Sequence, residues 1–266
     1  MPGDIVVCIK QVPHPDYLGK LSLDLARGTV NREGVPAIIN PVDRNAVEEA
    51  LCWRDKYGVR VIVLTMGPPQ ARKALEDALA MGADTAFHLC DRAFAGADSL
   101  ATAQTLAYAI RKLGQIPLII CGNATIDSGT GQVAVQLAEL LDLPGITDVA
   151  EAVYEESQSL LVRRVWEHGY IKVRVKLPAV LAVTGKINQP RLPNVPGIMA
   201  ARQKEIKTWT AADIGADTAG IGLGGSPTQF WQVSEFHARR QGEILQGTPE
   251  EVVTAAVDKL VKLELL

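Results

Sequence analysis

The sequence has few of the features that mark metal sites, disulfide-stabilised folds or membrane proteins. Its four cysteines are scattered over 266 residues without a Cys-x-x-Cys pair. Three of them, Cys8, Cys90 and Cys121, lie in apolar runs, where a reduced cysteine acts as a small hydrophobic side chain. We therefore expect neither a disulfide framework nor a metal site, as is typical of the reducing cytoplasm. No apolar run is long enough to cross a bilayer, and the N-terminal apolar run is too short for a signal peptide.

The chain also lacks a strong excess of charge and an obvious catalytic constellation. Its net charge is −3 and its pI about 5.9, which argues against a nucleic-acid partner. The phosphate-binding pattern GxxxxGK[ST] is absent, and the histidines at 88, 168 and 237 share no ligand spacing. Ser99 and Ser128 have no nucleophile-elbow context. The sequence therefore predicts binding, or chemistry performed by a bound cofactor, and leaves open whether the chain is itself an enzyme.

The chain does contain a regular alternation of strand and helix patterns. Hydrophobic residues make up 47% of it, enough for a large core. Across residues 1–143 continuous apolar runs alternate with amphipathic helical patterns. The expected strands are 5–9, 59–64, 85–90 and 116–121, and the expected helices begin near Asp43, Ala71, Asp98 and Thr130. This alternation predicts an α/β fold: a Rossmann-like, mostly parallel sheet flanked by helices.

The pattern changes after residue 150. Two β-rich runs, 160–166 and 170–176, flank Glu167-His168-Gly169 and predict a β-hairpin. A further strand is expected at 178–183. Periodicity then fades until a final helix at about 249–263. We therefore divide the chain into residues 1–185 and 186–266, and the composition of the second part fits either an arm lying on a partner or a loosely ordered tail.

The segment Cys-Gly-Asn-Ala-Thr-Ile-Asp-Ser-Gly-Thr-Gly-Gln-Val at 121–133 carries the best chemical signal. It lies where a buried strand ends and a helix begins, the place where parallel α/β sheets bind ligands. A phosphate there would accept bonds from the amides of residues 130–132, with Gly129 allowing close approach. Asp127 would accept bonds from ribose hydroxyls or an adenine amino group. The alternative is a tight turn whose hydroxyl side chain merely caps the helix, and the local pattern leaves both interpretations open.

A second glycine-rich segment, residues 220–225, contains the letters GxGxxG. The dinucleotide fingerprint requires a strand before it and a helix after it. Here the preceding residues are small and polar, and Ser226-Pro227 follows. We therefore interpret the segment as a flexible loop.

Several segments, taken together in their order and spacing, resemble the β subunit of electron-transfer flavoproteins. The resemblance covers almost the whole chain. The segments are VVCIKQVP near the start, INPVDRNAVEEA at 39–50, GPPQARKALEDALAMGAD at 67–84, TIDSGTGQV at 125–133 and KLPAVLAVTGKINQPRLPNVPGIMAARQK at 176–204.

The resemblance implies that residues 1–185 form an α/β nucleotide-binding domain in a heterodimer with an α subunit carrying its own FAD. Residues 186–266 would then form a partner-recognition loop and a C-terminal arm packing on that α subunit. The family pattern places the nucleotide contacts on four segments. They comprise Cys8; Asn40, Pro41, Val42 and Asp43; Met66; and Gly122, Asn123, Ala124, Thr125, Ile126, Asp127, Ser128, Gly129, Thr130, Gly131, Gln132 and Val133.

The family has two branches that differ in the nucleotide bound by this subunit. One binds AMP as a structural ligand and carries electrons from dehydrogenases. The other binds a second FAD, takes hydride from NADH and splits the electron pair between a high- and a low-potential acceptor. Segments 28–46 and 91–103 resemble the second branch, in which Asp98, Ser99 and Thr102 would lie near the flavin. The alternative for Asp98 is a simple helix cap.

This branch assignment implies FAD as cofactor, with AMP as the alternative, and NAD(H) as a candidate substrate. The implied partners are an acyl-CoA-type or other flavin dehydrogenase, with ferredoxin or flavodoxin as a candidate acceptor. One departure bears on the nucleotide: the family usually reads AIDGDTAQ where this chain reads TIDSGTGQ. Gly129 thus replaces an acid and Thr125 an alanine, which leaves FAD and AMP open.

Residues 188–199 resemble the family's partner-recognition loop. Val195 stands at the position of an exposed apolar anchor, with Leu192 and Pro196 beside it. An ordinary proline-rich connection is the alternative for this segment. A third hypothesis for the whole chain is an adenine-nucleotide-binding regulatory protein without a redox role.

Overall fold

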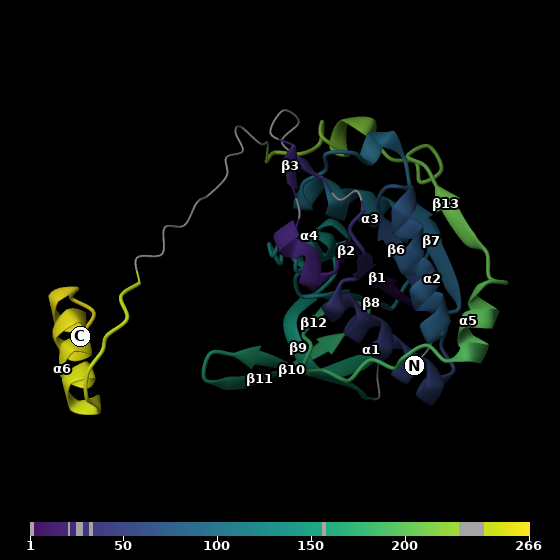
Figure 1. Ribbon diagram of the computed structural model, residues 1–266. Coiled ribbons are helices and arrows are strands. Elements are labelled where there is room, and N and C mark those ends of the chain that lie inside the picture. The colour runs from purple at the N-terminus through teal and green to yellow at the C-terminus, as the bar shows by residue number, and fades with distance from the viewer. Residues whose placement is uncertain (1–2, 21, 25–28, 32–33, 156–157, 229–241) are drawn as a thin grey trace. The chain divides into compact units, whose positions relative to one another are not determined.

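In the computed structural model, the chain forms two separate units, residues 1–231 and 232–266. The structure describes residues 3–20, 22–24, 29–31, 34–155, 158–228 and 242–266. The first unit is built around a nine-stranded sheet, and the second carries one helix (Figure 1). The predicted α/β class with a mostly parallel sheet is confirmed.

The elements of the first unit follow one another in the predicted alternation. Its strands are β1 (Ile5–Cys8), β2 (Gln11–Pro13), β3 (Ser22–Asp24), β4 (Thr29–Asn31), β5 (Ala37–Ile39), β6 (Val61–Met66), β7 (Thr85–Leu89), β8 (Leu118–Gly122), β9 (Gly145–Glu155), β10 (Ser159–Trp166), β11 (Gly169–Lys176), β12 (Ala179–Val183) and β13 (Ile206–Trp209). Its α-helices are α1 (Pro41–Tyr57), α2 (Arg72–Met81), α3 (Ser99–Leu113), α4 (Val133–Leu140) and α5 (Val195–Ala201). Short 3₁₀ turns occupy Pro15–Lys20, Pro69–Ala71, Arg92–Phe94 and Thr218–Gly220.

The strand order β11-β10-β9-β12-β8-β1-β6-β7-β13 places β8 and β1 side by side in the middle of the sheet. From β1 the chain moves outward in one direction through β6 and β7, and β8 then returns to the other side of β1. The strand order therefore reverses between β1 and β8. In open parallel sheets the crevice beyond the carboxyl ends of two such strands is where ligands bind.

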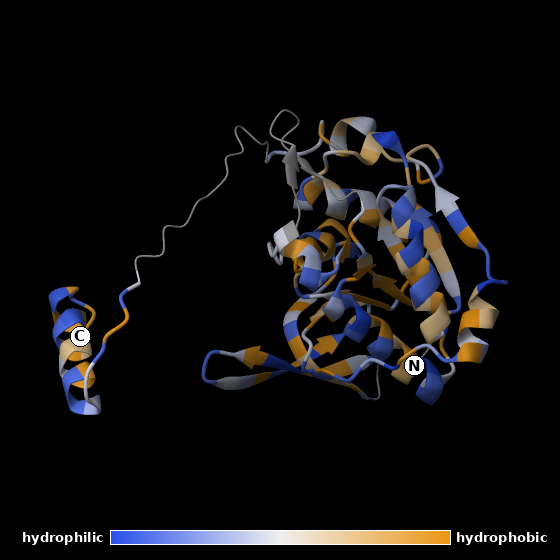
Figure 2. Ribbon diagram, viewed as in Figure 1, coloured by the Kyte–Doolittle hydropathy of each residue, from blue (hydrophilic) through white to orange (hydrophobic). Residues whose placement is uncertain are grey.

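Each face of the sheet is covered by its own pair of helices. Alternate residues of β1, such as Ile5 and Val7, pack with α1 and α2, while Val6 and Cys8 pack with α3 and α4. The inner strands β1, β8 and β12 are accordingly buried on both sides, and Figure 2 shows orange, apolar colouring on strands in the middle of the first unit. This packing explains why the sequence shows continuous apolar runs instead of a two-residue alternation.

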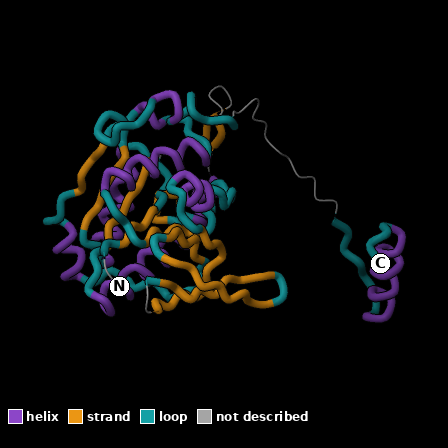
Figure 3. The backbone as a smooth tube through the Cα atoms, turned by 180° about the vertical axis from the view of Figure 1, so that it is seen from behind, coloured by secondary structure: helices purple, strands orange, loops and turns teal. Residues whose placement is uncertain are grey.

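The predicted hairpin is confirmed by β10 and β11, which pair in antiparallel register from Ser159–Lys176 to Trp166–Gly169. The two strands extend away from the body of the sheet (Figure 3). The 11-residue strand β9, which the sequence analysis missed, joins this hairpin to β12. It is irregular, since Asp148 has a left-handed φ of 56° and the β9–β12 register shifts. Because of this irregularity, residues 145–155 do not show the regular alternation of apolar and polar residues that would predict a strand.

Residues after 185 also join the first unit. Segment 206–209 adds β13 in parallel beside β7, and Ile206, Ala211, Ile214 and Ile221 are buried. These residues therefore pack as part of the first unit. The sequence analysis missed this part because so short a strand has no periodicity of its own.

The glycine-rich segment at 220–225 forms turns, and the described residues directly after it, 226–228, are not helical. A Cβ added at Gly222 would lie 2.0 Å from the Ala93 carbonyl oxygen, and one at Gly225 would lie 2.2 Å from the Gly220 carbonyl carbon. Gly222 therefore allows close packing over the turn that holds Ala93, and Gly225 allows the segment to fold back on Gly220.

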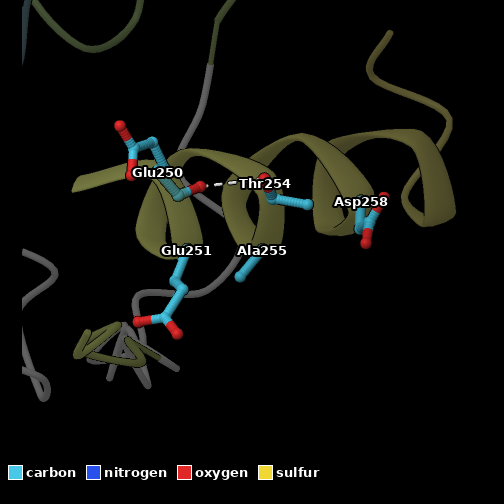
Figure 4. A pocket seen from close by; sticks show the side chains of 5 residues that line it. All are labelled: Glu250, Glu251, Thr254, Ala255 and Asp258. Carbon is cyan, nitrogen blue, oxygen red and sulfur yellow. Dashed lines mark hydrogen bonds between the residues drawn. The ribbon is translucent and has the colours of Figure 1, made fainter. Parts of the chain in front are cut away.

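The second unit contains α6 (Pro249–Lys262), at the position predicted for the final helix. A capping box of Thr248 and Glu251 starts it, and the acidic first turn and basic last turn complement the helix dipole. Its apolar residues Val253, Val257 and Leu260 are exposed. Figure 4 shows the acidic residues Glu250, Glu251 and Asp258 lining a shallow pocket on this helix. All the residues lining that pocket belong to α6.

All four cysteines are free. Among the described residues there is neither a metal-binding group of three or more His, Cys, Asp or Glu nor a helix able to span a membrane.

Candidate functional site at the carboxyl ends of the strands

Four predicted contact segments meet at one edge of the sheet. Because β1, β6 and β8 are parallel neighbours, their last residues Cys8, Met66 and Gly122 end at the same edge. Cys8 and Cys121 are register partners across the reversal point between β1 and β8. The first turn of α1, which includes Pro41, Val42 and Asp43, begins at this edge as well, since Asp43 bonds to Gly122.

Asp43 joins the two central strands. Its Oδ2 accepts a hydrogen bond from the Lys10 backbone N at 2.8 Å, and its Oδ1 accepts one from the Gly122 backbone N at 3.1 Å. The sequence analysis expected α1 to begin near Asp43, and the helix begins two residues earlier, at Pro41, with residue 40 in the cap position. Proline favours the first helical position because it lacks the N–H that would be unpaired there. Asp43 is thus freed to hold the ends of β1 and β8 together.

Burial dominates the chemistry of the Asp43 carboxyl. Its residue is only 4% exposed, and burial raises its pKa from 3.8 to about 7. Hydrogen bonds from Asn40, Lys10 and Gly122 and the Lys10 charge oppose this rise without cancelling it. The protonation of this carboxyl therefore changes near neutral pH.

Asn40 fixes the loop that follows β8. Its side chain is fully buried, its Nδ2 donates to the Ala124 carbonyl at 2.9 Å, and its Oδ1 accepts from the Ile126 N at 3.2 Å. Its own backbone N donates to the Lys10 carbonyl at 2.9 Å. One buried amide thus ties the ends of β1, α1 and the 123–132 loop to one another.

Lys10 and Asp127 form an ion pair at the same edge, with Lys10 Nζ 2.8 Å from Asp127 Oδ1. The Asp127 side chain is only 7% exposed, whereas that of Lys10 is 39% exposed. Asp127 therefore lies in the wall of the site with one carboxylate oxygen paired to a lysine.

The loop itself is polar and mostly exposed. The Thr125 and Ser128 hydroxyls are 2.7 Å apart, and the Gly129 N donates to the Thr125 carbonyl at 2.8 Å. Gly129 and Gly131 both have a φ of 64°, and a Cβ at Gly131 would approach the Asn123 carbonyl to 3.2 Å. The expected helix start near Thr130 is therefore wrong: two left-handed residues cannot belong to a right-handed helix, and α4 begins at Val133.

The start of α3 lies beside this loop. Ser99 Oγ donates to Gln132 Oε1 at 2.9 Å, which links two of the predicted cofactor-binding segments. Asp98 caps α3 by accepting from the Ala101 N at 3.0 Å and also accepts from the Thr228 N at 3.0 Å. The capping alternative for Asp98 is thus confirmed as its role in this structure. Thr102 lies one turn into α3, where its N donates to the Asp98 carbonyl at 3.0 Å.

The predicted partner-binding residues lie elsewhere on the first unit. Leu192 is 79% exposed and Val195 is 73% exposed, and Pro196 occupies the first turn of α5. Helix α5 packs against the last turn of α2, because a Cβ at Gly197 would approach the Ala80 carbonyl to 2.5 Å. The strand-end residues and the exposed apolar residues therefore form two distinct regions.

A family model described as the electron transfer flavoprotein domain matches residues 27–214. The chain belongs to the electron-transfer flavoprotein family. It is 46% identical over 257 residues to the electron transfer flavoprotein subunit beta of Clostridium acetobutylicum, with 97% of each chain covered. It is 42% identical over 264 residues to the caffeyl-CoA reductase-Etf complex subunit CarD of Acetobacterium woodii, covering 98% and 99% of the two chains.

A third relative, the acryloyl-CoA reductase electron transfer subunit gamma of Anaerotignum propionicum, is 38% identical over 271 residues, with 98% of this chain and 99% of the relative covered. The resemblance to electron-transfer flavoprotein β subunits is thus confirmed along nearly the full chain.

Lys10 is the site residue that the sequence analysis missed. It lies inside the VVCIKQVP segment, two residues after the end of β1, and a charged residue directly after a buried strand was the available signal. Its partner Asp127 is 117 positions away in the sequence, so only the fold brings the two together.

Proposed function

We propose that this electron-transfer flavoprotein subunit binds FAD at the carboxyl ends of β1, β6 and β8 and takes part in electron bifurcation. The observation that carries the proposal is the anchoring of the polar 123–132 loop at the reversal point of the sheet by Asn40 and Lys10, while Asp43 holds Gly122 directly before it. A loop fixed in this way is preorganised, so binding loses little conformational entropy.

The residues present suit an adenine nucleotide. Asp127 supplies a carboxylate that accepts ribose or adenine donors, and Thr125, Ser128 and Thr130 supply hydroxyls. Gly129 and Gly131 let the backbone approach a phosphate closely, and the start of α4 adds partial positive charge. The FAD held by these residues would supply the redox chemistry, namely acceptance of hydride from NADH and delivery of the electrons to a high- and a low-potential acceptor. The chain's own residues bind and orient, and no side chain acts as acid or base.

A second candidate is an electron carrier with AMP as structural ligand. It is favoured by one observation: both Asp98 oxygens accept backbone amides, from Ala101 and Thr228, so that Asp98 has a structural role that needs no flavin. In the neighbouring loop, Gly129 stands where the family usually has an acid, so this chain also lacks a carboxylate there that could contact a flavin.

Nucleotide content separates the two candidates. We would coexpress the chain with its α subunit, purify the complex gently and quantify the extracted nucleotides by chromatography. Two FAD per αβ pair support the leading proposal, and one FAD with one AMP supports the second candidate. A complex without nucleotide in this subunit would contradict both.

We expect Lys10→Met to lower the affinity for the nucleotide roughly tenfold, the equivalent of about 1.4 kcal/mol. The reason is that the substitution leaves the nearly buried Asp127 carboxylate without its lysine and loosens the loop. Nucleotide retained after dialysis is the measurement. Lys73→Met is the matched control, since it removes the exposed Lys73–Asp77 pair on α2. Equal retention by the two variants would contradict the assigned role of Lys10.

The partners we propose are the α subunit and an acyl-CoA-type flavin dehydrogenase, with ferredoxin or flavodoxin as low-potential acceptor. The C-terminal arm, with the exposed apolar residues of α6, would pack on the α subunit. Leu192, Val195 and Pro196 would contact the dehydrogenase. A suitable probe is the caffeyl-CoA reductase of Acetobacterium woodii, named with the 42% identical relative.

We expect Val195→Asp to weaken binding of this reductase at least tenfold, because a charge replaces an exposed apolar anchor that would become buried on docking. Binding is measured by biosensor with the αβ complex immobilised. Val153→Asp, which alters a 44% exposed residue on β9, is the control and is expected to bind normally. Unchanged binding by Val195→Asp would place the docking surface elsewhere.

A further inference from the structure

The segment between β12 and α5 follows the surface of α1 and is held there by charged side chains. Arg191 Nε donates to Glu48 Oε2 at 2.9 Å, and its Nη2 donates to Glu48 Oε1 at 3.0 Å. The same Nη2 lies 3.0 Å from Asp55 Oδ2. The backbone N of Arg191 also donates to Glu48 Oε2 at 3.0 Å. Glu48 thus fixes both the side chain and the backbone at this position.

A second anchor lies three residues earlier. Asn188 Nδ2 donates to the Asn45 carbonyl at 3.1 Å and to Glu49 Oε2 at 3.0 Å. In return, Asn45 Nδ2 donates to the Asn188 carbonyl at 2.9 Å. Glu49 is further held by Trp53 Nε1 at 2.8 Å. The two anchors leave residues 188–191 attached to successive turns of one helix.

The carboxylates that hold the 188–191 segment, Glu48 and Glu49, are buried. Glu48 is 6% exposed and Glu49 is 8% exposed. Burial opposes ionisation of Glu48, but the hydrogen bonds from Arg191 outweigh it and lower the pKa of this carboxyl below its usual value. Burial also raises the pKa of Glu49, against the opposing bonds from Asn188 and Trp53. A bidentate guanidinium–carboxylate pair fixes orientation as well as position.

The residues directly after this anchored stretch are unusually exposed. Leu192 and Val195 are 79% and 73% exposed, although the chain on both sides is fixed. On the far side, the Asn194 side chain accepts from the Gly197 N at 2.8 Å and caps α5, and Gly197 packs against Ala80. Two large apolar side chains are therefore held in water by a rigid frame.

We propose that Glu48 and Arg191 are positioning residues that clamp the 188–195 segment in the conformation that docks the dehydrogenase. The inference rests on the docking surface proposed above. Without the clamp the segment must be ordered when the partner binds, and that ordering opposes association. The clamp therefore acts on partner affinity and leaves nucleotide binding and electron chemistry unchanged. The reason is that the nucleotide site involves Asp43 in the first turn of α1, whereas the clamp involves Glu48 in a later turn.

The test compares Glu48→Gln with Glu155→Gln in the αβ complex. Glu155, at the end of β9, also binds an arginine through two contacts, from Nε at 2.7 Å and Nη2 at 3.4 Å of Arg174 on β11. For Glu48→Gln we expect faster deuterium exchange of the amides of residues 188–194 and a roughly tenfold higher KM for the caffeyl-CoA reductase. Its kcat and nucleotide content should stay unchanged. Arg191→Lys keeps the positive charge but cannot form the bidentate pair with Glu48, so we expect an intermediate KM.

The outcomes separate the clamp from the docking surface. If Val195→Asp weakens reductase binding but Glu48→Gln changes neither exchange nor KM, the clamp is overturned and the docking surface stands. If Val195→Asp has no effect, the docking surface fails and the clamp's role in docking falls with it. A Glu48→Gln variant that loses kcat or nucleotide together with KM would show a general structural role and would also overturn the proposal.

Discussion

Replacing Asp43 with alanine should lower the free energy of unfolding by about 3 kcal/mol and abolish nucleotide retention. The substitution leaves two backbone donors, the N–H groups of Lys10 and Gly122, without their acceptor at the buried junction of β1 and β8. Each unsatisfied buried donor costs about 1–3 kcal/mol. Urea titration of the αβ complex and nucleotide analysis after gel filtration measure the two effects.

The asparagine variant isolates the charge of Asp43. Because the folded-state pKa of about 7 lies above the ordinary 3.8, the folded protein holds this proton more strongly between those pH values. The contribution of Asp43 to stability is therefore present at low pH and is lost as the pH rises from about 4 to about 7. Between pH 5 and 7 the wild type should lose about 2 kcal/mol relative to Asp43→Asn.

Asp84→Asn is the matched control for this pH effect. Asp84 also accepts a backbone hydrogen bond, from the Val61 N at 2.8 Å, but at the opposite end of β6. We expect this variant to keep its nucleotide and to follow the pH dependence of the wild type. If Asp43→Asn also followed the wild type from pH 5 to 7, Asp43 would not be the group that titrates.

Gly122→Ala should have an effect of similar size, about 3 kcal/mol of unfolding free energy together with loss of the nucleotide. A Cβ at this position would lie 2.2 Å from Asp43 Oδ1 and 3.2 Å from the Asp43 N. The Asp43 side chain cannot move aside, since its other oxygen is bound to Lys10. The start of α1 must therefore shift away from β8. Thermal unfolding and nucleotide content are the measurements.

Gly185→Ala provides the control for Gly122→Ala. It follows β12, and an added Cβ would meet only Asn45 Oδ1 at 3.8 Å, an ordinary contact distance. We expect a change of less than about 1 kcal/mol and full nucleotide content. Equal stability of the two variants would mean that the close approach of Gly122 and Asp43 is relaxed at little cost.

These results would connect the two regions of the subunit through one helix. The first turn of α1 carries Asp43 at the proposed nucleotide site, and its middle turns carry Glu48 and Glu49 at the proposed clamp. A cofactor site and a partner-docking segment built on one rigid helix keep a fixed geometry relative to each other. Electron transfer benefits from such rigidity because the donor and acceptor must meet in one orientation.

The sequence by itself determined the α/β alternation, the location of the strand-end loops and the family. Buried parallel strands leave continuous apolar runs and amphipathic helices leave a periodic pattern, so 116–121 and 249–263 were predicted correctly within a few positions. Only the tertiary structure decided the role of Asp43 and the pairing of Lys10 with Asp127, which lie far apart in the chain. It also decided that 206–209 completes the sheet, because a four-residue strand is stabilised by its neighbour β7 and not by its own pattern.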